Sequence, residues 1–140
     1  MTEGNKIWVK VGQTEPTEVS FQALDSKGKE LGTALLFQTR HAEFALMGYV
    51  NTKDYGGKGS GASLELIKAR VHHAFEKLDG IKSLIVNFTA LDKEKMRQVR
   101  QRYEKFGFSK EGASDYLLIL TRENYERLKE KGTYAHNLIE

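Results

Sequence analysis

Apolar and polar positions alternate at residues 7–11 and 19–24 of the chain, and this period-2 pattern predicts two strands. Two further strands are predicted at residues 31–39 and 43–51, which are rich in apolar residues. Residues 12–18 are polar and hold the only proline, so they are expected to form a loop. Residues 25–30 are typical of a hairpin turn between the second and third strands. The N-terminal part of the chain therefore predicts strands joined by short connections.

After residue 61 the apolar residues recur at helical spacing. One helix is expected to end before Gly80, a second to span residues 92–106 and end at Gly107, and a charged third to span residues 123–131, followed by a tail. Two further strands are expected at residues 83–86 and 116–120, with a short strand opening at Phe108. This order predicts a single domain over residues 1–140 with an α/β (mixed α+β) fold, a mostly antiparallel sheet flanked by helices.

A glycine-rich turn, residues 56–61, lies between the fourth strand and the first helix. The first N–H groups of a helix have no intrahelical partner, and the helix dipole favours an anion there. Glycine allows the backbone to approach a phosphate closely. The turn therefore predicts an anion site. A plain tight connection, with Ser60 or Ser63 capping the helix, remains the alternative.

Two familiar phosphate motifs fit this turn less well. A nucleoside-triphosphate loop needs Ser or Thr after its Gly-Lys pair, but Gly59 follows Lys58. The dinucleotide fingerprint is met only in a relaxed form, and it follows a run of strands where alternating strands and helices are expected. Neither motif accounts for the context of the turn.

Two segments resemble hallmarks of the GNAT acetyltransferase superfamily. Residues 54–64, Asp-Tyr-Gly-Gly-Lys-Gly-Ser-Gly-Ala-Ser-Leu, are similar to its acetyl-CoA signature, and residues 102–108, Arg-Tyr-Glu-Lys-Phe-Gly-Phe, to its helix ending Tyr-Glu-Lys-x-Gly-Phe. The two segments occur in the family order, with a strand between them. The resemblance covers roughly residues 19–120 and implies an acetyl-CoA-dependent N-acetyltransferase acting on an amine of a small molecule or protein.

The resemblance also implies a set of site residues. Tyr103 matches the tyrosine that protonates the departing CoA thiolate in many members. The cofactor-binding residues would be Tyr49, Val50 and Asn51 at the end of the fourth strand, and Gly56, Gly57, Lys58, Gly59, Ser60, Gly61 and Ala62 in the turn and the helix start. Glu43, on the fourth strand, is the best candidate for a general base, and a surface carboxylate is its alternative interpretation. No metal is expected, and the adjacent His72 and His73 have no second ligand pair at metal spacing.

Three departures from the family pattern keep other functions open. Gly56 stands at the usual Gln/Arg position, Met96 stands where many members carry an asparagine, and only residues 12–18 separate the first two strands, where members usually have two helices. The chain could therefore be a catalytically inactive module of this fold that binds CoA or a partner protein. A third hypothesis is a polyanion-binding protein that uses the basic helix 93–105.

Composition and charge exclude only a few classes of protein. The 140 residues are 39% hydrophobic, and the net charge of +3 suits an anionic ligand. No cysteine is present, which excludes disulfides and thiolate catalysis. The chain shows no signal peptide, no apolar run of membrane-span length and no nucleic-acid-binding motif. We expect a cytoplasmic protein, with a protein partner or a second copy of the chain as a candidate for completing the acceptor side.

Overall fold

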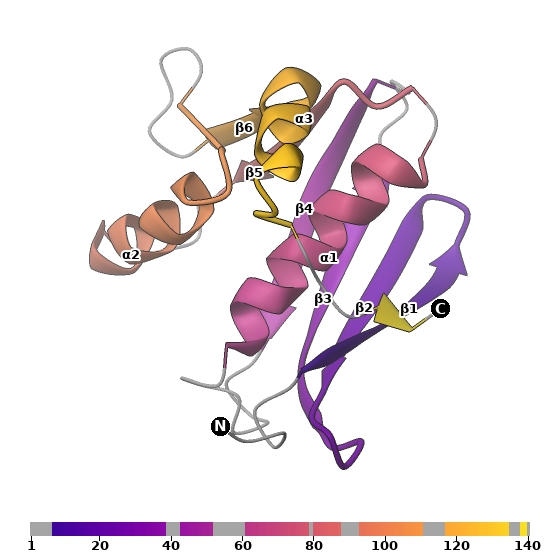
Figure 1. Cartoon of the computed structure of the whole chain (residues 1–140). Coiled ribbons are helices and arrows are strands. Elements are labelled where there is room, and N and C mark those ends of the chain that lie inside the picture. The colour runs from indigo at the N-terminus through magenta and orange to yellow at the C-terminus, as the bar shows by residue number, and fades with distance from the viewer. Residues whose placement is uncertain are drawn as a thin grey trace.

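The structure is a computed structural model that describes residues 7–38, 43–51, 61–78, 80–87, 93–110, 117–134 and 138–139. Its strands are β1 (Trp8–Glu15), β2 (Glu18–Leu24), β3 (Glu30–Gln38), β4 (Phe44–Asn51), β5 (Ser83–Asn87), β6 (Leu117–Thr121) and β7 (Leu138–Ile139). Its helices are α1 (Ala62–Glu76), α2 (Lys93–Glu104) and α3 (Arg122–Glu130). Figure 1 shows α1 lying along the sheet.

Within the described residues the strands form one sheet in the order β6-β5-β4-β3-β2-β1-β7. The pairs β1–β2, β2–β3, β3–β4 and β5–β6 are antiparallel, whereas β4–β5 and β1–β7 are parallel. The parallel pair β4–β5 is joined through α1, as a crossover connection requires. The prediction of a mixed, mostly antiparallel sheet with flanking helices is confirmed.

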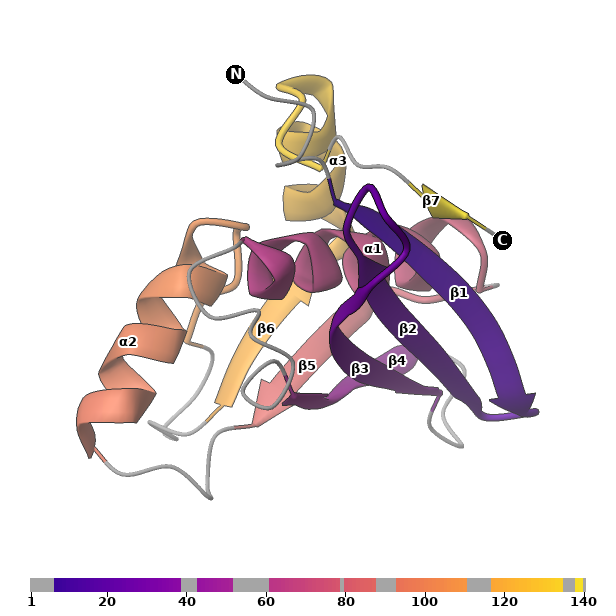
Figure 2. The ribbon, with the colours of Figure 1, turned by 90° about the horizontal axis from the view of Figure 1, so that it is seen from below.

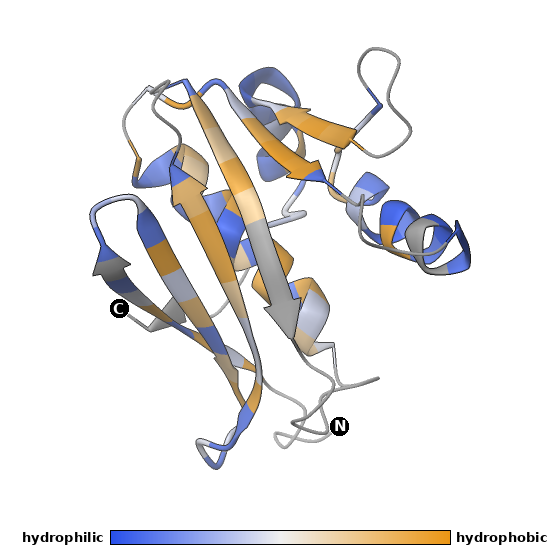
Figure 3. Cartoon of the chain, turned by 180° about the vertical axis from the view of Figure 1, so that it is seen from behind, coloured by the Kyte–Doolittle hydropathy of each residue, from blue (hydrophilic) through white to orange (hydrophobic). Residues whose placement is uncertain are grey.

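The main core lies between α1 and one face of β1–β4 (Figure 2). Alternate residues of β2 and β3 are buried on this face, because successive side chains of a strand point to opposite sides. They contact a buried stripe of α1 in which residues recur every three or four positions. The buried residues concerned are Val19, Phe21, Ala23, Ala34 and Leu36 of the sheet and Leu66, Ile67, Arg70, Val71 and Ala74 of the helix. The opposite face of β1–β4 has no described helix over it (Figure 3).

The first connection differs from its prediction. β1 continues to Glu15 and pairs with β2 up to Glu15–Glu18, so only Pro16 and Thr17 turn the chain. The expected loop at residues 12–18 is therefore mostly strand. Gly12, Gln13 and Glu15 are exposed and are held in the sheet by backbone pairing. Because neither face of this segment is buried, its sequence shows no alternation of apolar and polar residues. A tight hairpin thus joins the first two strands, where the resemblance to the GNAT superfamily would lead one to expect two helices.

The C-terminal part of the chain packs more closely against the rest of the molecule than expected. Tyr125 of α3 is 1% exposed and stacks on Phe75 of α1 at 4.6 Å between ring centroids, so α3 is not simply a solvent-facing helix. Tyr134 is buried and donates a hydrogen bond to the carbonyl of Phe106. β7 pairs with β1, which corrects the expectation of a plain tail. A single aromatic residue and a two-residue strand produce no periodicity, so the sequence pattern missed both.

Both the backbone conformation and the surrounding packing require glycine at Gly107, which follows α2. Its φ is +91°, and an added Cβ would overlap Leu128 Cδ1 and lie 3.1 Å from Leu120 Cδ1. We expect Gly107→Ala to lower the free energy of unfolding by about 2–3 kcal/mol, from left-handed strain plus overpacking. Gly132→Ala is the matched control, since its φ is +79° and nothing lies within 4 Å of the added Cβ. It should cost about 1 kcal/mol. Urea unfolding of both variants measures the difference, and equal losses would exclude a packing contribution.

Glu76 ties α1 to α3 and should make stability depend on pH. Hydrogen bonds from Lys129 and Tyr125 hold the pKa of the Glu76 carboxyl below its ordinary value of 4.5. A lowered folded-state pKa gives stability that is complete above the unfolded-state pKa and is lost as pH falls through the folded-state value. Thermal melts from pH 7 to pH 3 should therefore show Glu76→Gln destabilised at neutral pH and converging with the native protein in acid. Glu130→Gln, an exposed carboxylate of α3, should show no such convergence.

Candidate functional site

β4 and β5 pair over only three residues and then separate. Their register runs from Phe44–Ser83 to Leu46–Ile85, although both strands continue. Directly after this point β4 carries a β-bulge. Met47 pairs with Leu36 and Val50 with Ala34, so three steps along β4 match two along β3. A bulge bends a strand and redirects its backbone groups. Figure 3 shows the two strands diverging toward their C-terminal ends.

Tyr49, Val50 and Asn51 belong to this diverging end of β4. The backbones of Val50 and Asn51 pair with Ala34 and Thr33 of β3, on the side away from β5. The β5-facing backbone edge of β4 makes no described strand pair after Leu46. A strand edge of this kind is where a ligand could add like a further strand, and the cofactor role of Tyr49, Val50 and Asn51 stays a prediction.

The N-terminus of α1 follows that end of β4. Gly61 is the N-cap residue, with φ 92° and ψ 0°, and no side chain among the described residues makes a capping hydrogen bond there. The first intrahelical bond runs from the N–H of Glu65 to the carbonyl of Gly61, at 3.1 Å. The capping alternative therefore does not hold for Ser63, since the helix begins at Ala62 and Ser63 lies within its first turn. Gly56, Gly57, Lys58, Gly59 and Ser60 lie outside the described residues.

Arg102 of α2 reaches the first turn of α1. Its Nη1 donates to Ser63 Oγ at 3.2 Å, which places a half-buried guanidinium beside the positive end of the helix dipole. Two positive features at one place favour a negatively charged ligand. In the sequence, Arg102 belongs to the basic helix and opens the segment 102–108 that resembles the GNAT hallmark, but no local pattern names its partner. The two partners are 39 positions apart in the chain.

Tyr103, in the last turn of α2, is buried, with 5% of its surface exposed. Its ring packs edge-on against Phe108 at 5.2 Å between centroids. Its hydroxyl oxygen accepts a hydrogen bond from Arg70 Nη2 at 3.3 Å. Tyr103 is thus a core residue by its ring, while its hydroxyl is directed toward α1.

Glu43 lies in a different place. It precedes β4, at the end opposite Asn51, and eight residues of strand separate the two by roughly 25 Å. Its carboxylate is 55% exposed and forms an ion pair with Lys82 Nζ at 3.0 Å. The structure therefore does not bring Glu43 to the N-terminus of α1, and its surroundings match the surface-carboxylate interpretation.

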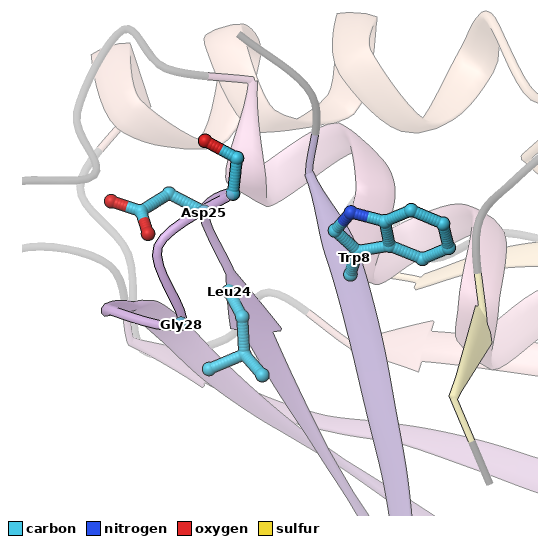
Figure 4. Close-up of a pocket in the computed structure, with 5 residues that line it drawn as sticks. Trp8, Leu24, Asp25 and Gly28 are labelled. Atoms are coloured by element: carbon cyan, nitrogen blue, oxygen red, sulfur yellow. The ribbon is translucent and has the colours of Figure 1, made fainter. Parts of the chain in front are cut away.

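Other described features add no second site. A hollow of about 300 Å³ is lined by Trp8, Leu24, Asp25, Ser26 and Gly28. Figure 4 shows the residues around it. Asp25 there accepts hydrogen bonds from the backbone N–H groups of Lys27 and Lys29, so its carboxylate stabilises the turn. Among the described residues no group of three His, Cys, Asp or Glu side chains could hold a metal. None of the helices in the described part of the chain is long and apolar enough to cross a membrane.

Comparison with solved structures shows which class of fold this is: the chain has the fold of N-acetyltransferases. Among the structures that match is one of mutant forms of the spermidine/spermine N-acetyltransferase SpeG from Vibrio cholerae, with a TM-score of 0.67 and 16% sequence identity. The match covers 83% of this chain and 71% of that one. The same bacterium's spermidine N-acetyltransferase in complex with CoA and spermine matches with a TM-score of 0.61 and 17% identity, over 81% and 70% of the two chains.

A third structure, SpeG from Vibrio cholerae with manganese ions, matches with a TM-score of 0.65 and 16% identity, over 82% and 71% of the chains. No family model and no curated protein matches the sequence. At these identities the likeness concerns the fold, and the fold that the sequence resemblance implied is confirmed.

Proposed function

We propose that this protein is an acetyl-CoA-dependent N-acetyltransferase. The observation that carries the proposal is the separation of β4 and β5 at the β4 bulge, next to a helix N-terminus whose N-cap residue is the glycine Gly61. The described residues fit the cofactor. The first turn of α1 and Arg102 suit a diphosphate, and the β4 edge suits the pantetheine arm. The solved neighbour with CoA and spermine supports an amine as the acceptor class.

The residues would act on the thioester in three ways. Acetyl-CoA supplies an activated acetyl group, which the acceptor nitrogen attacks directly. The β4 backbone N–H groups at the bulge would hold the carbonyl oxygen as it becomes negative. Tyr103 would give its hydroxyl proton to the departing sulfur, and its position at the α1–α2 contact supports this assignment. The backbone N–H groups of Gly57 to Ala62 would bind the diphosphate, as the resemblance implies.

Calorimetry with acetyl-CoA followed by a turnover assay tests the proposal. We expect binding, and release of free CoA thiol when acetyl-CoA is mixed with an amine from a panel of polyamines, small amines and lysine-containing proteins. No binding at millimolar acetyl-CoA would refute the proposal. Binding without turnover on any amine would identify the inactive CoA-binding module. The polyanion hypothesis receives less support, because Glu94 on the same helix pairs with Arg97 at 2.6 Å and offsets its positive charge.

The general base is tested in the same assay. We expect Glu43→Gln to keep kcat/KM within about twofold, because an exposed carboxylate in a surface ion pair contributes little. Lys82→Gln removes the same ion pair from the other side and is the matched control. A tenfold or larger loss in Glu43→Gln alone would restore Glu43 as the base.

A partner on the open face of the sheet would complete the acceptor side. Phe44 and Leu46 there remain 36% and 38% exposed, and no described helix covers this face. Light scattering of the purified protein measures whether two copies associate.

A further inference from the structure

A fully buried arginine stands on the core-facing side of α1. Arg70 is 0% exposed, on the same stripe as Leu66 and Ala74. Its Nε donates to the carbonyl of Leu66 at 3.1 Å, one turn back in the same helix. This bond fixes the plane of the guanidinium relative to α1. The bond from its Nη2 to Tyr103 then reaches across to α2.

The direction of this second bond follows from the chemistry of the two groups. Arginine has five N–H donors and no acceptor. The hydroxyl oxygen of Tyr103 therefore accepts from Arg70, and the hydroxyl hydrogen of Tyr103 cannot be given to Arg70 in return. That hydrogen must be directed to another acceptor. A hydrogen bond from a cation also strengthens as its acceptor oxygen becomes negative.

We propose that Arg70 is a positioning residue for Tyr103 in acetyl transfer, an inference that rests on the proposed function. Arg70 holds the phenol oxygen so that its proton is directed to an acceptor other than Arg70, and during acetyl transfer that acceptor would be the departing sulfur. As the new N–C bond forms and the C–S bond breaks, Tyr103 Oη transfers its proton to the thiolate, giving CoA thiol and a phenolate. The Arg70 N–H stabilises that phenolate until the proton lost by the acceptor nitrogen returns to it through solvent.

A purely structural role predicts different behaviour. If Arg70 only linked α1 to α2, its loss would lower stability and disturb acetyl-CoA binding, whatever residue stood at position 103. If it acts through the Tyr103 hydroxyl, its loss should affect the chemical step and should matter only while that hydroxyl is present. A double-mutant cycle separates the two roles.

The experiment measures kcat, KM for acetyl-CoA and the dissociation constant of CoA in the native protein, Arg70→Gln, Arg70→Lys, Tyr103→Phe and both double variants. Arg70→Gln should lower kcat about tenfold to a hundredfold, the range for a lost hydrogen bond to a charged group, and leave KM nearly unchanged. Arg70→Lys, which keeps a cationic donor, should recover part of the loss. In the Tyr103→Phe background either change should alter kcat less than about twofold.

Two results would overturn the inference alone: an equal loss of kcat in both backgrounds, or an effect confined to KM and CoA affinity. If thermal melts show that Arg70→Gln does not fold, Arg70→Lys takes its place in the cycle. It should then lower kcat by a smaller factor, and only while the Tyr103 hydroxyl is present. If the native protein binds no CoA or turns over no amine, the proposed function fails first, and the inference fails with it. The native control therefore distinguishes the two failures.

Discussion

Replacing Tyr103 with phenylalanine is expected to lower kcat about a hundredfold, the usual contribution of a positioned acid. KM for acetyl-CoA should stay within about twofold, because a group that acts only on the developing thiolate contributes to the transition state and not to ground-state binding. Phenylalanine keeps the edge contact with Phe108 and removes only the hydroxyl. Steady-state kinetics with saturating amine measure the effect.

The same change leaves a buried donor of Arg70 without its acceptor, which should cost about 1–3 kcal/mol of stability. Tyr125→Phe is the matched control for that cost. Tyr125 is equally buried, and its hydroxyl donates to Glu76, on the part of α1 opposite its N-terminus. Tyr125→Phe should lose stability and keep its kcat. An unchanged kcat in Tyr103→Phe would refute the assignment of Tyr103 as the acid.

Replacing Ser63 with glutamate should lower the affinity for CoA about a hundredfold without lowering the stability of the fold. A carboxylate in the first turn of α1 is favoured by the helix dipole and can still accept from Arg102. The same charge would lie where a diphosphate is proposed to bind. Two unit charges about 6 Å apart repel by roughly 3 kcal/mol at an effective dielectric constant of about 20, which corresponds to about a hundredfold loss of affinity.

Ser63→Gln controls for size, since glutamine has nearly the shape of glutamate and no charge. Calorimetry should show a large loss of CoA affinity for glutamate and a small one for glutamine, while thermal melts should show glutamate at least as stable as the native protein. Equal affinities of the two variants would mean that no phosphate lies near Ser63. That outcome would remove the cofactor site from this end of α1.

Local patterns were sufficient to predict most elements of the fold. β2 and α1 were found from their periodicity, because each buries one face against the same core and spacing alone reveals that face. β3 was predicted from the hairpin turn that precedes it. The glycine turn marked the start of α1 because glycine stands where the backbone needs φ above zero, as Gly61 does at 92°. Where backbone pairing alone holds a segment, as at Gly12 to Glu15 and in β7, the pattern carries no signal and the prediction failed.

Arg70 could have been suspected from the sequence. It is a charged residue at a core position of a helical stripe, between Leu66 and Ala74, and a buried charge needs a hydrogen-bonding partner. Its partner could not be identified in this way. Tyr103 is 33 residues away, and only the packing of α2 against α1 brings the two together.

The sequence by itself determined the order of the elements, the glycine turn before α1 and the identity of the groups that could do chemistry, since these depend on short-range spacing and residue type. The tertiary structure alone decided that β4 and β5 separate at a bulge, that Arg102 meets Ser63 and that Arg70 holds the Tyr103 hydroxyl. Those contacts join residues far apart in the chain. They depend on strand register and helix packing, which are set by the whole core together and by no single segment.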